Sequence, residues 1–340
     1  MPAFSEDLKT DPLTMADVRD AVEALHGIVI RTPLLENPDV NARLGGRLLI
    51  KAECAQRTGA FKIRGAYNRI RHMTPGEKGR GAITYSSGNH AQGVALAARL
   101  LGSSALIVMP SDVPSDKIDR TRALGAEIAF YDREMQNSDD VVAELRAETG
   151  RVVVPPSGDV RVHAGAATVA TEIFDQASGL GALPDAILIP CGGGGLTAAT
   201  AFVANETSPE TSVFAVEPAL FDDTCRSLDA GERVRNPAGR TTICDSIMTP
   251  TPNEQTFEIN RKLLAGGLSV SDEEVCDAMR FAYEHFKIVV EPGAAVGIAA
   301  VLSGRIAIEG QTVVTVVTGG NVGSGRFCSL MNSVDVKSDR

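Results

Sequence analysis

The chain has 340 residues, of which 44% are hydrophobic and 22% are charged, so we expect a globular protein of about two domains. Its formal net charge of −10 argues against binding to nucleic acid or to an anionic membrane surface. No apolar run is long enough to span a bilayer, and the six cysteines form no Cys-x-x-Cys pair. This cysteine pattern argues against a zinc site and a disulfide framework, and it indicates a reducing, cytoplasmic location.

In chain order, short runs rich in β-branched residues alternate with helical patterns. We expect strands at residues 46–53, 81–86, 104–109, 126–130, 151–154, 185–190, 211–217 and 311–317. We expect helices at residues 62–73, 89–101, 115–123, 138–149, 165–178, 195–204, 253–265 and 271–286. Strands that alternate with helices predict an α/β fold with two open, twisted, mostly parallel sheets and helices on both faces.

The expected strands form two groups along the chain. Residues 79–155 hold four short strand–helix units, and we expect them to form a small domain. Residues 1–78 and 156–340 are expected to form a large domain. Because open parallel sheets bind ligands at the carboxyl ends of their strands, functional residues should come directly after strands.

Three glycine-rich turns do follow expected strands. CGGGGL (191–196) precedes an alanine-rich helix, and its glycines would let several backbone N–H groups approach one ligand, which suits a phosphate. SSGNHAQG (86–93) and TGGNVGSG (318–325) follow two other strands. The alternatives are a flexible turn for the first segment and a plain serine N-cap for the second. CGGGGL matches neither the dinucleotide fingerprint nor the nucleotide P-loop.

Lys62 lies in TGAFKIRG (58–65), among small, aromatic and aliphatic residues, although an exposed helix lysine is the commoner case. The motifs TGAFKIRGA, SSGNHAQGVA, CGGGGL, EPGAAVG (291–297) and TGGNVG occur in this order. Together they resemble the fold-type II pyridoxal-phosphate enzymes, specifically the serine/threonine dehydratase family with serine racemase and 3-hydroxyaspartate ammonia-lyase. The resemblance covers about residues 20–330 and implies a fold like that of the tryptophan synthase β-subunit.

The resemblance implies that Lys62 binds pyridoxal 5′-phosphate as a Schiff base, since a partly desolvated lysine has a lowered pKa and a nucleophilic amine. The other cofactor-binding residues that it implies are Phe61, Asn89, Thr318 and the amides of Gly192, Gly193, Gly194 and Gly195. The glycine amides would hold the phosphate. The Thr318 hydroxyl would lie beside the pyridine nitrogen, which favours elimination over transamination. The large domain would then carry the cofactor, and the small domain would close over the substrate.

By the same resemblance, Ser86, Ser87, Asn89 and His90 contact the substrate, mainly at its α-carboxylate. Ser87 matches a serine of the serine racemases and the hydroxyaspartate ammonia-lyases that acts as acid/base on the face opposite the lysine. It would allow racemisation beside elimination, since racemisation needs two opposed bases. The alternative is that Ser87 only supports the loop.

Two residues, of which His163 departs from the family pattern, are expected near the side-chain end of the substrate pocket. His163, in RVHAGAAT (161–168), replaces an aliphatic residue, and Arg133 lies in YDREMQN (131–137). As cationic or donor groups they would favour a substrate with a second carboxylate, such as 3-hydroxyaspartate. The alternative is a change at a helix start without contact to the ligand.

The segment FAVEPALFDDT (214–224) resembles the divalent-cation segment of the family. Glu217, Asp223 and the carbonyl of Phe221 would supply oxygen ligands that suit Mg²⁺, Ca²⁺ or Mn²⁺. From spacing alone, two carboxylates six residues apart are more often solvated surface groups.

The resemblance therefore implies an ammonia-lyase (dehydratase) that converts L-threonine, L-serine or 3-hydroxyaspartate to a keto acid or imine plus ammonia by α,β-elimination. One alternative is a serine or aspartate racemase that uses Lys62 and Ser87. Another is a catalytically inactive amino-acid sensor. The intact Lys62 argues against a sensor. We expect a cytoplasmic homodimer acting on a small molecule, with no nucleic-acid or membrane partner.

Overall fold

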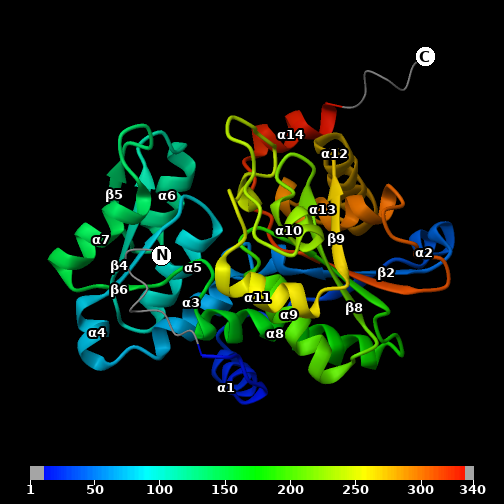
Figure 1. Ribbon diagram of the computed structural model, residues 1–340, viewed down its shortest axis with the longest axis horizontal. Helices are drawn as coiled ribbons and strands as arrows, with labels where there is room; N and C mark the ends of the chain where they lie inside the picture. The colour runs from blue at the N-terminus through cyan, green and yellow to red at the C-terminus, as the bar shows by residue number, and fades with distance from the viewer. Residues whose placement is uncertain (1–10, 334–340) are drawn as a thin grey trace. The chain divides into compact units, whose positions relative to one another are not determined.

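The computed structural model describes residues 11–333, and their contacts divide the chain into two compact units (Figure 1). Unit 1 consists of the described residues up to Val29 and of Ala60–Thr168. Unit 2 consists of Ile30–Gly59 and of the described residues from Val169 onward. Among the described residues, no helix is both long enough and apolar enough to cross a membrane.

Unit 1 is built on a four-stranded, all-parallel sheet with the order β5-β4-β3-β6. Its strands are β3 (Ala82–Tyr85), β4 (Ala105–Pro110), β5 (Glu127–Tyr131) and β6 (Val152–Val153). Its helices are α1 (Met15–Leu25), α3 (Lys62–Arg71), α4 (Pro75–Arg80), α5 (Asn89–Leu100), α6 (Ser115–Ala123), α7 (Ser138–Thr149) and the first part of α8 (Val160–Gly179).

Strand β4 shows how unit 1 buries both faces of its sheet. Ala105, Ile107 and Met109 belong to a hydrophobic cluster with helices α3 and α5. The alternate residues Leu106 and Val108 belong to a second cluster with α7. Because successive side chains of a strand point to opposite faces, this continuous apolar run is what a parallel strand covered on both sides requires.

Helix α3 lies against the start of α8 at very close range. A Cβ atom added to Gly165 would come 2.4 Å from the Arg64 carbonyl oxygen, and one added to Gly65 would come 2.8 Å from the Val162 carbonyl oxygen. Glycine permits this approach of two helix backbones because it has no side chain. The contact fixes α3, and with it Lys62, relative to α8.

Unit 2 is built on a six-stranded sheet with the order β1-β2-β10-β7-β8-β9. Strand β1 runs antiparallel to β2, and the other neighbours are parallel. The strands are β1 (Leu34–Glu36), β2 (Arg47–Ala52), β7 (Ala186–Pro190), β8 (Ser212–Pro218), β9 (Gly266–Val270) and β10 (Thr312–Val317).

The helices of unit 2 are α2 (Pro38–Leu44), the second part of α8, α9 (Gly195–Thr207), α10 (Asp223–Ala230), α11 (Glu254–Leu263), α12 (Asp272–Phe281), α13 (Pro292–Leu302) and α14 (Ser324–Asn332). Short 3₁₀ turns occupy Glu53–Ala55 and Asp245–Ile247, and a π-helical turn occupies Ala282–Phe286. Helix α13 forms the centre of the core, where it packs on β7, β8 and β10. A Cβ atom added to its Gly297 would come 2.0 Å from Thr315 Oγ1 of β10.

The predicted α/β fold with mostly parallel sheets is confirmed. All eight predicted strands are present, as β2 to β8 and β10, each within one residue of its predicted ends. The predicted helices are present as α3, α5, α6, α7, α8, α9, α11 and α12. Strands β1 and β9 and several helices were not predicted. Strand β9 begins with two glycines, which have low strand propensity, and α13 is buried on all sides and so has no helical periodicity.

The two units have different boundaries from the expected domains. Residues 11–29, 60–78 and 156–168 group with the four-stranded sheet, whereas the expected small domain held only residues 79–155. The physical reason is that α3 shares a buried hydrophobic cluster with α5 and β4. The motif TGAFKIRG is therefore divided, because Gly59 belongs to unit 2 and Lys62 belongs to unit 1.

The glycine contact between α3 and α8 makes a testable prediction. Gly165→Ala should lower the free energy of unfolding by about 1–3 kcal/mol, because the new methyl group meets backbone atoms that cannot move aside. Gly179→Ala, in the last turn of the same helix, is the matched control, because its added Cβ has no neighbour within 4 Å. Thermal unfolding of both variants checks this, and equal melting temperatures would contradict it.

Candidate active site

Lys62 is the first residue of α3, and its amine lies in a desolvated part of unit 1. Nζ donates a hydrogen bond to the Pro156 carbonyl oxygen at 3.1 Å and lies 5.0 Å from the centre of the Phe61 ring. Removal from water lowers the pKa of this amine from 10.5 to about 8. An appreciable fraction of Lys62 is therefore the neutral, nucleophilic amine near neutral pH.

Lys51 of β2, in unit 2, is also buried, but its surroundings are different. Its Nζ donates to Glu172 Oε2 at 2.6 Å, to Gln176 Oε1 at 2.8 Å and to the Thr32 carbonyl oxygen at 2.7 Å. A carboxylate and two further acceptors compensate the buried ammonium group. Lys51 therefore has a structural role, whereas Lys62 has the environment of a reactive amine.

The turn between β3 and α5 presents the start of a helix. The N-cap residue of α5 is Gly88, which has no side chain to satisfy the first-turn amides. The Ser86 hydroxyl accepts a hydrogen bond from the Gly88 amide at 3.2 Å, and Ser87 and Asn89 are half-buried in the same turn. The positive end of the helix dipole and its first amides suit an anionic group such as a carboxylate.

The side chain of His90, in this turn, is bonded to the backbone of the segment that follows β6. Its Nε2 donates to the Val154 carbonyl oxygen at 2.9 Å, and burial lowers the pKa of the imidazole to about 3. The single N–H group of the neutral ring therefore donates to Val154. Its Nδ1 is a buried acceptor without a partner among the described residues. The Nε2 hydrogen of His90 is therefore already used by the protein itself.

Of the two residues expected as cationic or donor groups, Arg133 is a cation paired at the surface, and His163 is buried and neutral. Arg133 is 55% exposed, and its Nη2 forms an ion pair with Asp112 Oδ1 at 2.7 Å. His163 is buried, its Nε2 accepts a hydrogen bond from the Gly158 amide at 3.1 Å, and desolvation lowers the pKa of its imidazole to about 4. His163 is therefore neutral, and its remaining polar group is the Nδ1 hydrogen.

In unit 2, the tetraglycine turn follows β7 and leads into α9. Gly194 has φ of +80°, and a Cβ atom there would come 2.7 Å from Asn260 Nδ2 and 2.8 Å from Thr256 Oγ1 of α11. Thr256 Oγ1 donates to the Gly193 carbonyl oxygen at 2.7 Å, and Asn260 Nδ2 donates to the Gly194 carbonyl oxygen at 3.4 Å. Helix α11 thus fixes the peptide planes of a loop at a helix N-terminus, where a phosphate is favoured.

The third glycine-rich turn follows β10 and begins with Thr318, which is buried. Its geometry is fixed by Thr58 and Gly59 from the start of TGAFKIRG. Asn321 Nδ2 donates to the Thr58 carbonyl oxygen at 2.8 Å, and the Gly320 amide donates to the Gly59 carbonyl oxygen at 2.9 Å. Two predicted motifs, far apart in sequence, therefore meet in unit 2.

The two carboxylates of the predicted cation segment are buried instead of lying on the solvated surface. Glu217, in β8, accepts hydrogen bonds from the Thr224 and Cys225 amides at the start of α10. Asp223 Oδ1 accepts from Asn236 Nδ2 at 2.6 Å, while Asp223 Oδ2 is buried without a partner among the described residues. Burial raises the pKa of Glu217 to about 8 and that of Asp223 to about 6. Within residues 11–333 no three His, Cys, Asp or Glu side chains form a ligand cluster.

Sequence reasoning missed three positioning groups: Thr256, Asn260 and the Pro156 carbonyl. The spacing of Thr256 and Asn260 was a signal in the sequence, since they lie four residues apart on the predicted helix 253–265 and so share one face. No sequence signal marked the Pro156 carbonyl, because every residue has a backbone acceptor.

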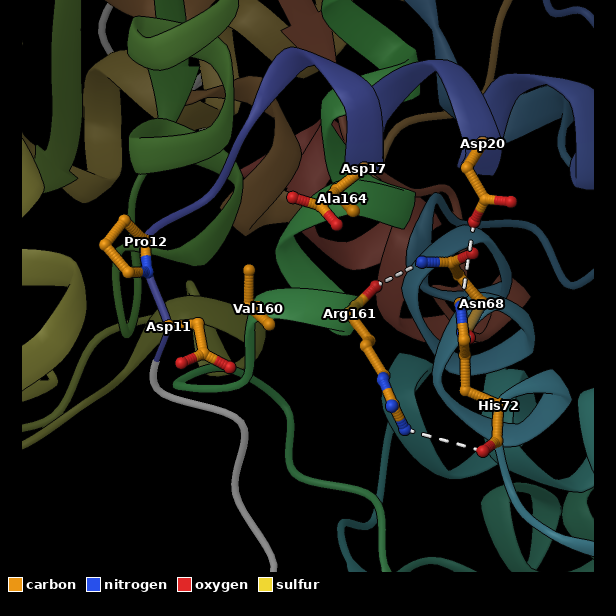
Figure 2. A pocket seen from close by; sticks show the side chains of 9 residues that line it. All are labelled: Asp11, Pro12, Asp17, Asp20, Asn68, His72, Val160, Arg161 and Ala164. Atoms are coloured by element: carbon orange, nitrogen blue, oxygen red, sulfur yellow. Dashed lines mark hydrogen bonds and ion pairs between the residues drawn. The ribbon is translucent and has the colours of Figure 1, made fainter.

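A polar cavity of about 290 Å³ lies in unit 1 among residues with no predicted role (Figure 2). It is lined by Asp11, Pro12, Asp17, Asp20, Asn68, His72, Val160, Arg161 and Ala164. Asn68 Nδ2 donates to the Arg161 carbonyl oxygen at 2.7 Å, and Arg161 Nη1 donates to the His72 carbonyl oxygen at 3.5 Å. These bonds hold α3 to the start of α8.

A desolvated lysine reacts with an aldehyde, and a glycine turn at a helix N-terminus binds a phosphate. An α/β protein with both features is suited to a cofactor that combines the two groups. The family described as "Pyridoxal-phosphate dependent enzyme" matches residues 25–319, and the chain belongs to this family.

Individual relatives match along nearly the whole chain. It is 38% identical to the L-threo-3-hydroxyaspartate ammonia-lyase of Pseudomonas sp, with 93% of this chain and 97% of the relative covered. It is 33% identical to the serine racemase of Schizosaccharomyces pombe, with 94% and 97% covered. The crystal structure of the T.th. threonine deaminase matches with a TM-score of 0.86 and 40% identity, covering 92% of this chain and 99% of that one.

The lowered pKa of Lys62 can be measured directly. In cofactor-free protein, acetylation of the Lys62 amine should rise with pH to a midpoint near 8, because only the neutral amine reacts and the protonated form dominates below that pH. Competitive labelling with peptide mass spectrometry checks this, with the exposed Lys262 as the internal control. A Lys62 midpoint near 10.5, the ordinary value for lysine, would contradict a desolvated amine.

Proposed function

We propose that the chain is a pyridoxal-phosphate-dependent ammonia-lyase that removes the β-hydroxyl and the amino group of a small β-hydroxy-α-amino acid. The observation that carries the proposal is the Lys62 amine, which is desolvated, bonded to one carbonyl and set at the start of α3. The names of the hydroxyaspartate ammonia-lyase and the threonine deaminase among the relatives support the reaction class. The cytoplasmic location stays a prediction from the cysteine pattern, and the homodimer stays a prediction from the resemblance.

The residues present fit the cofactor. Lys62 offers a nucleophilic amine, and the turn Gly192–Gly195 offers amides at the start of α9, in a loop that Thr256 and Asn260 fix by binding the Gly193 and Gly194 carbonyl oxygens. We propose that these groups bind the aldehyde and the phosphate, with Phe61 and Asn89 at the ring and the hydroxyl of Thr318 at its nitrogen. When bound, the cofactor supplies the electron sink that makes the α-proton of the substrate acidic.

The protein groups then have defined tasks. The first amides of α5, with Ser86 and Ser87, would hold the substrate carboxylate, since an anion is favoured at a helix N-terminus. The neutral Lys62 amine would take the α-proton, with the Pro156 carbonyl accepting one amine hydrogen and so orienting the lone pair. The β-carbon–oxygen bond breaks, the hydroxyl leaves with a proton as water, and hydrolysis releases a keto acid and ammonia.

Substrate choice within this class is tested by keto-acid release. Neutral His163 and paired Arg133 supply no free cation, so a second carboxylate of the substrate would have to be bound by hydrogen-bond donors. We expect turnover of at least one of L-serine, L-threonine and the 3-hydroxyaspartate stereoisomers, and kcat/KM ranks them.

Lys62→Ala should lower kcat at least about 1,000-fold, whereas Lys262→Ala on the exposed face of α11 should not. Turnover retained by Lys62→Ala would contradict the proposal.

A second candidate function, amino-acid racemisation, is favoured by Ser87 and by the serine racemase among the relatives. Racemisation needs an acid on the face opposite the lysine. If Ser87 is that acid, L-serine recovered at partial conversion will contain D-serine, and Ser87→Ala will abolish the D-isomer while elimination continues. Chiral chromatography measures this. Enantiopure serine from the unmodified enzyme would exclude the second function for that amino acid.

We also propose that Glu217 and Asp223 bind a divalent cation with the Phe221 carbonyl. Asp223 Oδ2 has no partner within residues 11–333, and the pKa of Glu217 is raised, so the charges of these buried carboxylates are not compensated. Without a cation, the folded state favours protonated Glu217, so stability falls as pH rises from about 4.5 through about 8. A cation needs the ionised carboxylates. Mg²⁺ or Ca²⁺ should therefore raise the melting temperature more above about pH 8 than at about pH 6. Asp223→Asn should remove the effect, and equal melting curves with cation and with chelator would contradict the proposal.

A further inference from the structure

The segment that connects β6 to α8, Val154–Asp159, is held from several sides. Its sequence is VPPSGD, and its two prolines have no N–H, so the amides of Ser157 and Gly158 are the donors of the tight PPSG turn. Gly158 has φ of +81°, a conformation that favours glycine, and it is buried. A buried amide needs an acceptor, and its loss leaves an unsatisfied donor.

Three side chains from three helices bind alternate residues of this segment. His90 of α5 donates from Nε2 to the Val154 carbonyl oxygen at 2.9 Å. Lys62 of α3 donates from Nζ to the Pro156 carbonyl oxygen at 3.1 Å. His163 of α8 accepts at Nε2 from the Gly158 amide at 3.1 Å. The segment thus connects the reactive amine to His163 through two peptide bonds of the same turn.

The downstream end of the segment is anchored independently. Asp159 Oδ1 accepts from the Arg161 and Val162 amides and so caps α8, while its Oδ2 accepts from Arg69 Nε of α3 at 3.1 Å. The bonds of Asn68 and Arg161 in Figure 2 add to this anchor. Because α8 is fixed to α3, the ring of His163 sits on a rigid base and can fix the turn in front of it.

His163 is suited to this role in its neutral form. Its ring is buried, and desolvation is the main reason that the pKa of the imidazole falls to about 4; Asp159 opposes this shift, and the Lys62 charge adds to it. Nε2 therefore accepts the Gly158 hydrogen throughout the neutral range, while Nδ1 carries the proton. An aliphatic side chain at this position, as the family pattern has it, would offer no acceptor.

We propose that His163 is a positioning residue of the Lys62 site: by accepting the Gly158 amide hydrogen, it fixes the turn whose Pro156 carbonyl holds the Lys62 amine whenever that amine is free. The role in turnover rests on the proposed function. Loss of this role should slow the proton-transfer step, because the amine must point its lone pair at the substrate. A small misplacement of the amine lowers the rate more than it weakens substrate binding.

Three substitutions separate this role from a direct contact with substrate. His163→Gln places an amide oxygen near the position of Nε2, so it keeps the acceptor for Gly158. His163→Asn places its amide near the position of Nδ1, so it keeps only the group that could face a substrate. His163→Leu keeps much of the volume and neither polar group. Hydrogen exchange of segment 154–160 in the holoenzyme is measured beside kcat and KM.

We expect leucine and asparagine to accelerate amide exchange in the segment at least about tenfold, because the Gly158 amide loses its acceptor. The same two variants should lower kcat about tenfold with KM changed less than about twofold, and glutamine should restore both exchange and kcat. Unchanged exchange and kcat in the leucine variant would overturn the proposal. Rescue by asparagine and not by glutamine, with a raised KM, would overturn it in favour of a substrate contact through Nδ1.

The unmodified holoenzyme gives a test that no folding defect can obscure. The Gly158 amide should exchange at least about tenfold more slowly than that of Ser157, which has no hydrogen-bond partner among the described residues. Equal exchange of the two amides would show that His163 does not hold the turn. If no β-hydroxy amino acid is turned over, the proposed function fails, whereas the exchange result still decides the role of His163.

Discussion

The removal of one amine from water is the constraint on which the chemistry of this protein depends. Lys62 could have its charge compensated by a carboxylate, as Lys51 does with Glu172, and it would then be a structural lysine. Instead its amine meets one carbonyl oxygen and an aromatic ring, and desolvation brings its pKa to about 8. A neutral lysine amine is both the nucleophile that binds an aldehyde cofactor and the base that removes an α-proton.

A set of contacts within unit 1 keeps that amine in place. Glycines at positions 65 and 165 let the backbones of α3 and α8 approach closely, so the helix start at Lys62 has little freedom. The turn after β6 carries the acceptor for the amine, and two buried neutral histidines hold this turn. Unit 2 fixes its glycine turn in a comparable way, through Thr256 and Asn260 of α11, so that amides are available at the start of α9.

The sequence predicted the features that depend on pattern and spacing. The eight strands came from β-branched runs, and the glycine turns were found because they follow strands. Lys62 was found from its motif. What the sequence could not show is charge state, because a pKa depends on burial and on neighbours from distant segments. Arg133 is cationic but pairs with Asp112 at the surface, and His163 is a buried neutral acceptor. The unit boundary was also missed, since the packing of α3 on α5 is a tertiary contact.

We propose that Lys62, and no other lysine, binds the cofactor. Reduction of the holoenzyme with borohydride converts a lysine Schiff base into a stable amine, and peptide mass spectrometry then locates the pyridoxyl phosphate group. We expect the label on the peptide that contains Lys62, in about one copy for each chain, with Lys51 unmodified. Label on Lys51 or on an exposed lysine such as Lys262, together with an unlabelled Lys62 peptide, would contradict the assignment of Lys62.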